Sequence, residues 1–191
     1  PQYFSTQWVN EQSRIQTIGV QHHAHLAACM AENQLTEPVV GIIMDGTGYG
    51  TDGTIWGGEI LVGDYNNFDR FAHFERMPLP GGDAAIKSPW RTAVSYLHKT
   101  FNNSIPNLPF IDNHDIAPIV EMVDKNINSP LTSSCGRLFD AVAAMSGGKQ
   151  TIRYEAQAAI ELMQEFETMN VRPFAFIIEQ KSDHREILLQ P

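Results

Sequence analysis

Residues 39–62 read VVGIIMDGTGYGTDGTIWGGEILV, and this stretch decides the fold class. An apolar run rich in β-branched residues ends on Asp45, four glycines follow within residues 46–53, and a second strand is predicted over residues 54–62. In Rossmann and P-loop motifs the glycines lead into a helix, whereas here they lead back into a strand. The pattern predicts a tight hairpin whose amides can approach phosphate oxygens, beside a strand-end carboxylate that can hold a cation. A hairpin with a purely structural role is the alternative that remains open.

The rest of the chain alternates between predicted helices and strands, which indicates an α/β protein. Helices are predicted over residues 22–33, 90–101, 137–145 and 154–168, with one more capped by Asp115, and strands over residues 15–20, 173–180 and 187–190. Residues 1–14 are interpreted as an arm or linker remnant, because this segment is mostly polar and lacks periodicity. Residues 15–191 are predicted to form the domain.

Composition narrows the possible partners. The 191 residues include 42% hydrophobic and 18% charged side chains, an ordinary balance for a folded domain. With 13 Lys and Arg against 22 Asp and Glu, the net charge of −9 argues against nucleic-acid binding. No apolar run approaches the roughly 20 residues that span a bilayer, so no membrane partner is expected. Two cysteines fit a reducing compartment, and we expect a cytoplasmic protein.

Three histidines lie within four residues, in the segment Gln21-His22-His23-Ala24-His25. His22 and His25 are spaced i, i+3 and therefore share a helix face, as metal ligands on one helix often do. Neutral imidazole is a usual ligand for zinc and iron. The alternative is a set of polar residues around a helix N-terminus, since this cluster does not fix a third ligand.

Two further motifs open helices in the second half of the chain. In SSCGRLFDAV, residues 133–142, small residues and Gly136 precede a helix whose N-terminus can face an anion or a ribose. Asp140 in that helix, and Glu155 at the start of the next, are also explained by the helix dipole.

Other polar segments receive a structural interpretation. Cys135 is interpreted as an inert thiol and residues 112–115 as a surface loop. Asp83 and Lys87 are either a salt bridge or ligand contacts.

Five segments in this order resemble the carbamoyltransferase module of the HypF family of hydrogenase maturation proteins. They are VQHHAH at 20–25, DGTGYGTDGTIWGGE at 45–59, LPGGDAAIKSPW at 79–90, TSSCGRLFDAVAA at 132–144 and YEAQAAIEL at 154–162. The family is similar to the tRNA threonylcarbamoyl transferases. The resemblance implies an actin-like ATPase, or ribonuclease H-like, fold with a mixed sheet and flanking helices. It also implies that the chain is the first lobe of a two-lobed module whose second lobe is absent.

The resemblance also implies site residues. His22, His25 and Asp45 correspond to ligands of a divalent metal, zinc or iron, and His25 and Asp45 to catalytic residues. The positions facing nucleotide or phosphate are Gly46, Thr47, Gly48, Gly50, Asp52, Gly53, Gly136, Asp140 and Glu155. The family usually spaces its histidine ligands i, i+4, whereas the spacing here is i, i+3. Either His22 or His23 can therefore be the first ligand.

The implied activity is transfer of a carbamoyl group from carbamoyl adenylate to the C-terminal cysteine of a hydrogenase maturation partner, for the cyanide ligands of nickel–iron hydrogenase. The parent protein would use carbamoyl phosphate and ATP with magnesium, releasing AMP. The isolated fragment is expected to be inactive. Two alternatives remain: a tRNA threonylcarbamoyl transferase, which the acidic charge disfavours, and a non-catalytic, sugar-kinase-like interaction module.

Overall fold

The glycine-rich segment forms a β-hairpin in the computed structural model, which describes residues 4, 7–8, 11–12, 20–101, 104–166 and 172–190. Strand β1 (Val39–Tyr49) pairs antiparallel with β2 (Ile55–Gly63), and β2 pairs antiparallel with β3 (Phe68–Phe74). The hairpin is confirmed, but β1 does not end at Asp45 as predicted. It runs four residues further, so the turn begins only at Gly50.

A bulge explains why Asp45 lies inside the strand. Met44 pairs with Gly58 and Gly48 pairs with Trp56, so β1 uses four steps where β2 uses two. The additional residues, Asp45 to Thr47, leave the regular ladder. Bulges re-aim side chains and often lie beside active sites. The bulge therefore frees Asp45 and the backbone of the following two residues for contacts outside the sheet.

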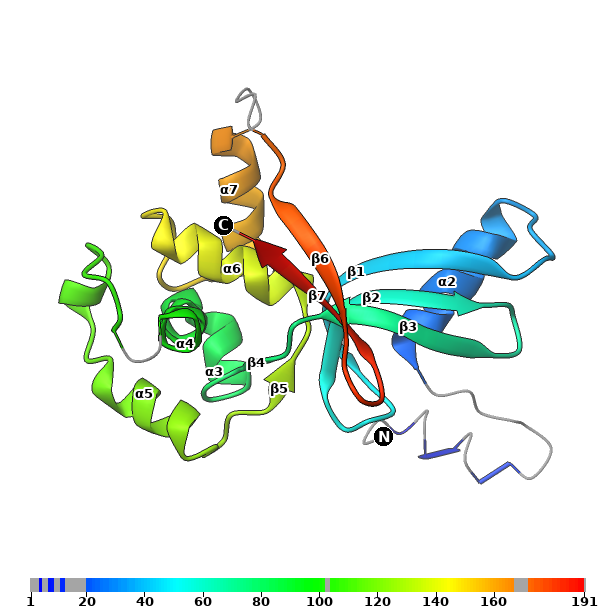
Figure 1. Ribbon diagram of the computed structural model, residues 1–191, viewed down its shortest axis with the longest axis horizontal. Helices are drawn as coiled ribbons and strands as arrows, with labels where there is room; N and C mark the ends of the chain where they lie inside the picture. Colours follow the sequence, from blue (N-terminus) through cyan, green and yellow to red (C-terminus); the bar gives the residue numbers. More distant parts are fainter. Residues whose placement is uncertain are drawn as a thin grey trace.

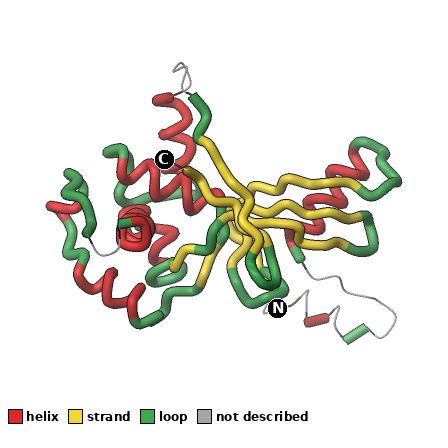
Figure 2. Tube along the Cα trace, viewed as in Figure 1, coloured by secondary structure: helices red, strands yellow, loops and turns green. Residues whose placement is uncertain are grey.

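Seven strands form one mixed sheet in the described part of the chain (Figures 1 and 2). The order is β4-β5-β2-β3-β7-β6, with β1 pairing to β2 beside this path. The strands not yet introduced are β4 (Met77–Pro78), β5 (Leu131–Thr132), β6 (Ala175–Gln180) and β7 (Arg185–Gln190). The β2–β5 and β3–β7 pairs are parallel.

Helices flank this sheet, as predicted. They are α2 (Gln21–Glu32), α3 (Asp83–Lys87), α4 (Pro89–Thr100), α5 (Ala117–Asp124), α6 (Cys135–Met145) and α7 (Gln157–Phe166), with a short 3-10 turn at Ile111–Asn113. The helix predicted from residue 154 begins three residues later. Ala156 has φ +60°, which is incompatible with a right-handed helix at that position. The strand predicted over residues 15–20 lies outside the described residues except for Val20.

Two apolar clusters hold the elements in place. One joins α2 to β1 and β2, where Leu26 and Met30 pack with Ile43, Trp56 and Leu61. The other lies among the helices shown to the left in Figure 1 and includes Ala93, Val94, Leu97, Phe110, Ile119, Ala141 and Ala144. Burial of one large aliphatic side chain contributes about 1.5–3 kcal/mol. The first cluster fixes the histidine-bearing helix against the hairpin.

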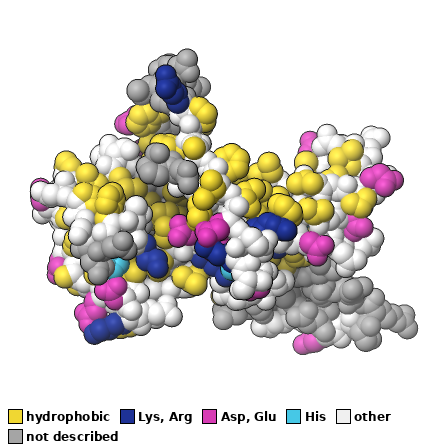
Figure 3. All heavy atoms as spheres, viewed as in Figure 1, with side chains coloured by type: hydrophobic (Ala, Val, Ile, Leu, Met, Phe, Trp, Pro, Cys, Tyr) yellow, Lys and Arg dark blue, Asp and Glu magenta, His cyan; other side chains and the backbone are white. Residues whose placement is uncertain are grey.

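Apolar side chains remain exposed on β1 and β6, as the yellow patches in Figure 3 show. Val40, Ile42 and Met44 on β1 are all more than half exposed, and β6 is exposed along its whole length. Within the described residues, no helix has both the length and the apolar character needed to cross a membrane.

Candidate functional site

Three predicted metal ligands lie together where α2 meets the bulge of β1. The Nε2 atom of His22 and the Nε2 atom of His25 each lie 3.7 Å from the Oδ2 atom of Asp45. Two ligands of a tetrahedral zinc ion, with bonds of about 2.0–2.1 Å, lie about 3.4 Å apart. These two spacings are only a few tenths of an ångström wider than direct ligation requires. The two histidine rings lie farther apart, with centroids 6.3 Å from each other, so their nitrogens must move closer together to share one ion.

The His22 imidazole is buried and lacks hydrogen bonds in the described part of the chain. Its side chain is fully buried, and neither Nδ1 nor Nε2 forms a hydrogen bond within the described residues. Burial lowers the pKa of His22, although the carboxylates of Glu59 and Asp45 oppose the shift. A neutral, buried imidazole without a hydrogen-bond partner is costly unless something else uses its lone pair. The donor set thus fits a divalent cation.

His23 points elsewhere. Its Nε2 atom lies 2.6 Å from the carbonyl oxygen of Asp64, and its ring stacks on Phe68 with a centroid separation of 4.9 Å. Of the two alternatives for the first ligand, the geometry favours His22.

Neighbouring groups orient Asp45. Its Oδ2 atom accepts a hydrogen bond of 2.9 Å from the Gln21 side chain, and its Oδ1 atom accepts one of 2.6 Å from the Gly46 amide. The role of Gln21 was not predicted from the sequence, although Gln21 lies directly before the histidine cluster. Such outer-shell partners set the orientation of a ligating carboxylate.

The His22 ring packs directly against the backbone of Gly48. A Cβ atom at position 48 would overlap the imidazole. We expect Gly48→Ala to push His22 away from Asp45 and to weaken Zn²⁺ binding by more than about tenfold, since loss of an outer-shell partner alone costs about 10–100-fold. Gly46→Ala is the control, because its Cβ would meet nothing closer than 3.9 Å. Competition with a chromophoric chelator measures both affinities, and equal affinities would contradict the packing argument.

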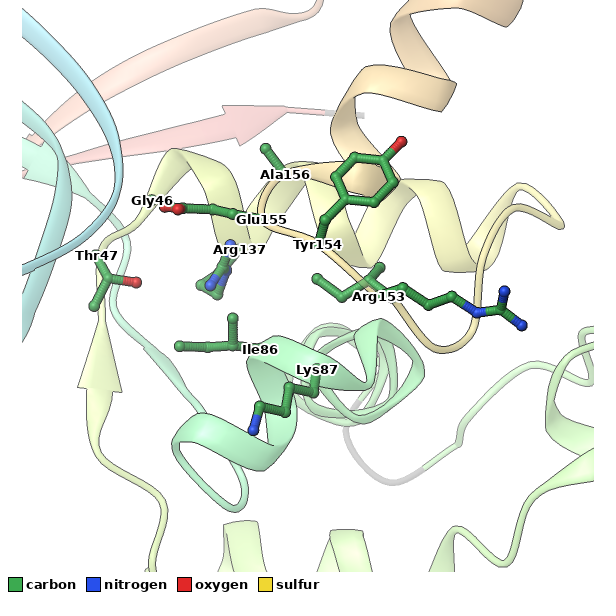
Figure 4. A pocket seen from close by; sticks show the side chains of 10 residues that line it. Gly46, Thr47, Ile86, Lys87, Arg137, Arg153, Tyr154, Glu155 and Ala156 are labelled. Carbon is green, nitrogen blue, oxygen red and sulfur yellow. The ribbon is translucent and has the colours of Figure 1, made fainter.

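A pocket of about 470 Å³ opens directly beside the bulge (Figure 4). Gly46 and Thr47 form one wall, and the others come from α3, α6 and the turn before α7. The lining residues are Gly46, Thr47, Ile86, Lys87, Arg137, Ile152, Arg153, Tyr154, Glu155 and Ala156. The lining contains three cationic side chains and one carboxylate, an excess of positive charge that suits an anionic ligand. The Arg153 guanidinium extends away from Gly46 (Figure 4). The volume is that of a small-molecule site.

Only some of the residues that were predicted to face nucleotide or phosphate line this pocket. Gly46, Thr47 and Glu155 do, whereas Gly48 packs on His22, and Gly50, Asp52 and Gly53 belong to the hairpin turn outside the lining. The Asp52 carboxylate accepts hydrogen bonds from Thr54 and Trp56 and pairs with Arg70 and Arg76 at 2.9 and 2.7 Å. Partial burial raises the pKa of Asp52, but these contacts outweigh it and hold the pKa well below its usual range. In this structure Asp52 stabilises the hairpin turn through these hydrogen bonds and ion pairs.

Gly136 and Asp140 also lie behind the pocket wall. The α6 N-terminus packs so closely on the bulge that a Cβ at Gly136 would lie 2.8 Å from the Gly46 Cα. The Ser134 hydroxyl bridges the same two segments, because it donates to the Gly46 carbonyl at 2.6 Å and accepts from the Arg137 amide at 3.1 Å. Asp140 is fully buried, 2.8 Å from the Arg137 guanidinium. Gly136 and Asp140 therefore hold Arg137 in position in the pocket wall.

Asp140 should make stability depend on pH. Burial raises the pKa of Asp140 from 3.8 to about 6, with Arg137 opposing the shift. The pKa of Asp140 is higher in the folded chain than in the unfolded chain, so the folded state binds the proton more tightly. The stabilisation of the folded state by protonated Asp140 is therefore lost as pH rises from about 4 to about 6. The shift of about two units corresponds to about 3 kcal/mol.

Asp140→Asn removes this titration. Urea denaturation at pH 4 and pH 7 measures the free energy of unfolding of both chains. The difference, variant minus unmodified chain, should increase by up to about 3 kcal/mol from pH 4 to pH 7. A difference that stays constant with pH would contradict the raised pKa.

A buried ionic network behind the hairpin was not predicted. Glu59 is fully buried and accepts hydrogen bonds from the amides of Gly57 and Gly58 and from the Ser133 hydroxyl. Arg70 pairs with it at 2.6 Å. The only sequence signal was the unusual acidic residue inside an otherwise apolar strand. The network links β2 and β3 to the loop that leads into α6.

A mixed sheet, a glycine-rich hairpin and a cationic pocket beside it define the class: a lobe of the actin-like, ribonuclease H-like fold. Comparison with family profiles is more specific. Residues 41–190 match the profile described as "Carbamoyltransferase, Kae1-like Domain, second subdomain", and residues 1–32 match that described as "HypF Kae1-like domain". The chain belongs to the HypF carbamoyltransferase family. The profile counts the matched unit as the second subdomain, so the assignment to a first lobe stays a prediction.

Individual relatives agree. The chain is 41% identical to "Carbamoyltransferase HypF2" of Cupriavidus necator over 85% of its length, and 46% identical to "Carbamoyltransferase HypF" of Rhodobacter capsulatus over 76%. The match covers 21% and 20% of those proteins. A solved structure titled "Crystal structure of full-length HypF in the phosphate- and nucleotide-bound form" aligns with TM-score 0.81 and 39% identity, over 97% of this chain and 24% of that one. The chain thus spans about a fifth to a quarter of these relatives.

Proposed function

We propose that this chain supplies the metal ligands and one wall of the nucleotide pocket for carbamoyl transfer in a HypF-type carbamoyltransferase. One observation carries the proposal: consecutive residues of the β1 bulge serve both sites. Asp45 joins the two histidines, while Gly46 and Thr47 line the cationic pocket. An ion at the histidines and a phosphate in the pocket would therefore be neighbours, as attack on an adenylate requires.

The residues present fit a divalent metal, zinc or iron, held by His22, His25 and Asp45. When bound there, it would supply Lewis-acid polarisation of the carbamoyl oxygen. The chain's own groups bind and orient the substrate. Lys87 and Arg137 neutralise phosphate charge, and the backbone amides of Gly46 and Thr47 can donate to phosphate oxygens.

In the proposed reaction, the partner's C-terminal cysteine thiolate attacks the carbamoyl carbon of carbamoyl adenylate. The carbon–sulfur bond forms, the bond from that carbon to the phosphate oxygen breaks, and AMP leaves with the electron pair. No nucleophile of this chain is needed, and burial raises the pKa of Cys135, which makes its thiol less reactive. ATP with magnesium and carbamoyl phosphate would be used elsewhere in the parent protein. Both cysteines are free, in keeping with a cytoplasmic location.

The two alternatives make different demands. A tRNA threonylcarbamoyl transferase needs a surface that attracts a phosphate backbone, and the net charge of −9 disfavours it. A non-catalytic module would not need His22 to remain buried without a hydrogen-bond partner. Stoichiometric metal that is lost on His25→Ala separates the enzyme from the non-catalytic module.

Nucleotide affinity tests the pocket. We expect this chain to bind ATP with magnesium weakly, because a two-lobed module closes its cleft with both lobes, and to bind at least tenfold more weakly than a longer chain that includes the second lobe but no adenylate-forming domain. Lys87→Ala should weaken calorimetric binding further, by about tenfold, through loss of a charged phosphate contact. Lys125→Ala is the matched control, since Lys125 pairs with Glu121 on the exposed face of α5. Equal, micromolar affinity of this chain and the longer chain would refute the two-lobe prediction.

A further inference from the structure

A second group of two histidines and a carboxylate lies where the β6–β7 hairpin meets β3. The hairpin continues the sheet beyond β3 (Figure 1), and β7 pairs with β3 in parallel. His73 of β3 is the register partner of Glu186 of β7. His184 precedes Glu186 by two residues. These three residues take no part in the site at the β1 bulge.

His73 presents a buried lone pair. Its side chain is fully buried, and its Nδ1 atom lies 2.7 Å from the Phe74 carbonyl oxygen. A carbonyl only accepts hydrogen bonds, so Nδ1 carries the proton and Nε2 carries the lone pair. Nε2 is buried and has no partner among the described residues. An acceptor left in that state carries a desolvation penalty that a cation would remove.

His184 and Glu186 create a related conflict. The Nδ1 atom of His184 lies 2.6 Å from a carboxylate oxygen of Asp183, which only accepts, so this nitrogen is the donor. The Nε2 atom lies 3.4 Å from the Glu186 Oε1 atom. In a neutral ring, Nε2 would point a lone pair at a carboxylate oxygen. A positive charge between the two atoms resolves the repulsion, and 3.4 Å is about the separation of two ligands on a tetrahedral zinc ion.

We propose that His73, His184 and Glu186 bind a divalent transition-metal ion, Zn²⁺ foremost, that fastens the β6–β7 hairpin to β3. Each residue offers a ligand atom, and these atoms all lie within 4.8 Å of one another. Two imidazoles and a carboxylate are an established zinc set, with water as the fourth ligand. Asp183 would hold the His184 ring in its ligating tautomer, as outer-shell carboxylates do.

The two rings now stack, with centroids 4.9 Å apart and planes inclined by 18°. Metal ligation requires His184 to rotate so that its Nε2 and that of His73 point at one ion. His184 lies just before β7, in the turn of the hairpin, and its side chain is 23% exposed, which leaves room for this rotation. A proton on His184 would also satisfy Asp183 and Glu186, but it would leave the Nε2 atom of His73 without a partner.

Zinc titration of the tag-free, chelator-stripped chain tests the proposal. The unmodified chain should bind two equivalents. His184→Ala and Glu186→Gln should each weaken one equivalent by more than about tenfold, whereas His25→Ala should affect only the other. Glu121→Gln is the matched control on α5. If the His184→Ala variant loses one equivalent of bound Zn²⁺ and the His25→Ala variant loses none, the result supports this second site and contradicts the proposed function. Unchanged binding in both hairpin variants would overturn the second site.

Amide hydrogen exchange gives an independent readout. Zn²⁺ should slow exchange of the β6 and β7 amides in the unmodified chain and in His25→Ala, because the ion ties the hairpin to β3. The same addition should have no effect on these amides in Glu186→Gln. If Zn²⁺ leaves β6 and β7 unprotected in the unmodified chain, the proton on His184 is the correct explanation and the metal site is refuted.

Discussion

Asp45→Ala in the full-length parent protein should reduce carbamoyl transfer to the partner cysteine by about 10²–10³-fold or more, the loss typical for one group that stabilises charge in a transition state. Asp45 lies 3.7 Å from both histidines and begins the bulge that forms the pocket wall, so its removal affects both parts of the site. His25→Ala should have a similar effect. Formation of the adenylate should persist, because we assign that step to another domain.

The assay follows carbamoyl-phosphate-dependent ATP turnover together with the mass of the carbamoylated partner peptide. Asp69→Ala is the matched control, since Asp69 is an exposed residue of β3. Transfer at the unmodified rate in both site variants would show that the residues are structural and would favour the non-catalytic module. Transfer to tRNA adenosine, but not to the peptide, by the unmodified protein would identify the tRNA-modifying enzyme.

Arg70→Ala should lower the free energy of unfolding by about 3–5 kcal/mol, because it leaves the fully buried Glu59 carboxylate without its counter-ion. Arg70 also pairs with Asp52 and lies 3.9 Å over the Trp56 ring, whose other neighbours include His22. Domains of this kind are stable by only about 5–15 kcal/mol, so the loss is a large fraction of the total.

Urea denaturation followed by circular dichroism measures this loss. The control is Lys125→Ala, which breaks an exposed pair worth about 0.5 kcal/mol or less. If Arg70→Ala shifts stability by less than 1 kcal/mol, as the control should, then water reaches Glu59 and the network is not a buried one.

Local patterns predicted much of this fold. The hairpin, α2, α4 and α6 follow from apolar periodicity and glycine placement, which depend on neighbours within a few residues. The structure also places His22 and His25 each 3.7 Å from Asp45, although β1 continues past Asp45 instead of ending there. Their roles as ligands remain a proposal.

The remaining features depend on contacts between distant segments. The β1 bulge arises from unequal pairing with β2, and no single residue signals it. Lys87, Arg137 and Tyr154 come from three separate elements that only the folded chain brings to one pocket. The pairing of Glu59 with Arg70 requires the β2–β3 register, and the late start of α7 reflects the positive φ of Ala156, which alanine rarely adopts.

Anomalous diffraction from zinc-loaded crystals of this chain shows directly whether an ion binds between α2 and the β1 bulge. We expect a peak about 2.0–2.2 Å from the Nε2 atoms of His22 and His25 and from a carboxylate oxygen of Asp45, whatever is found at the β6–β7 hairpin. In crystals of Asp45→Ala that peak should vanish or lose most of its height. A zinc-loaded crystal of the unmodified chain with no peak between α2 and the β1 bulge would rule out a metal site at these residues.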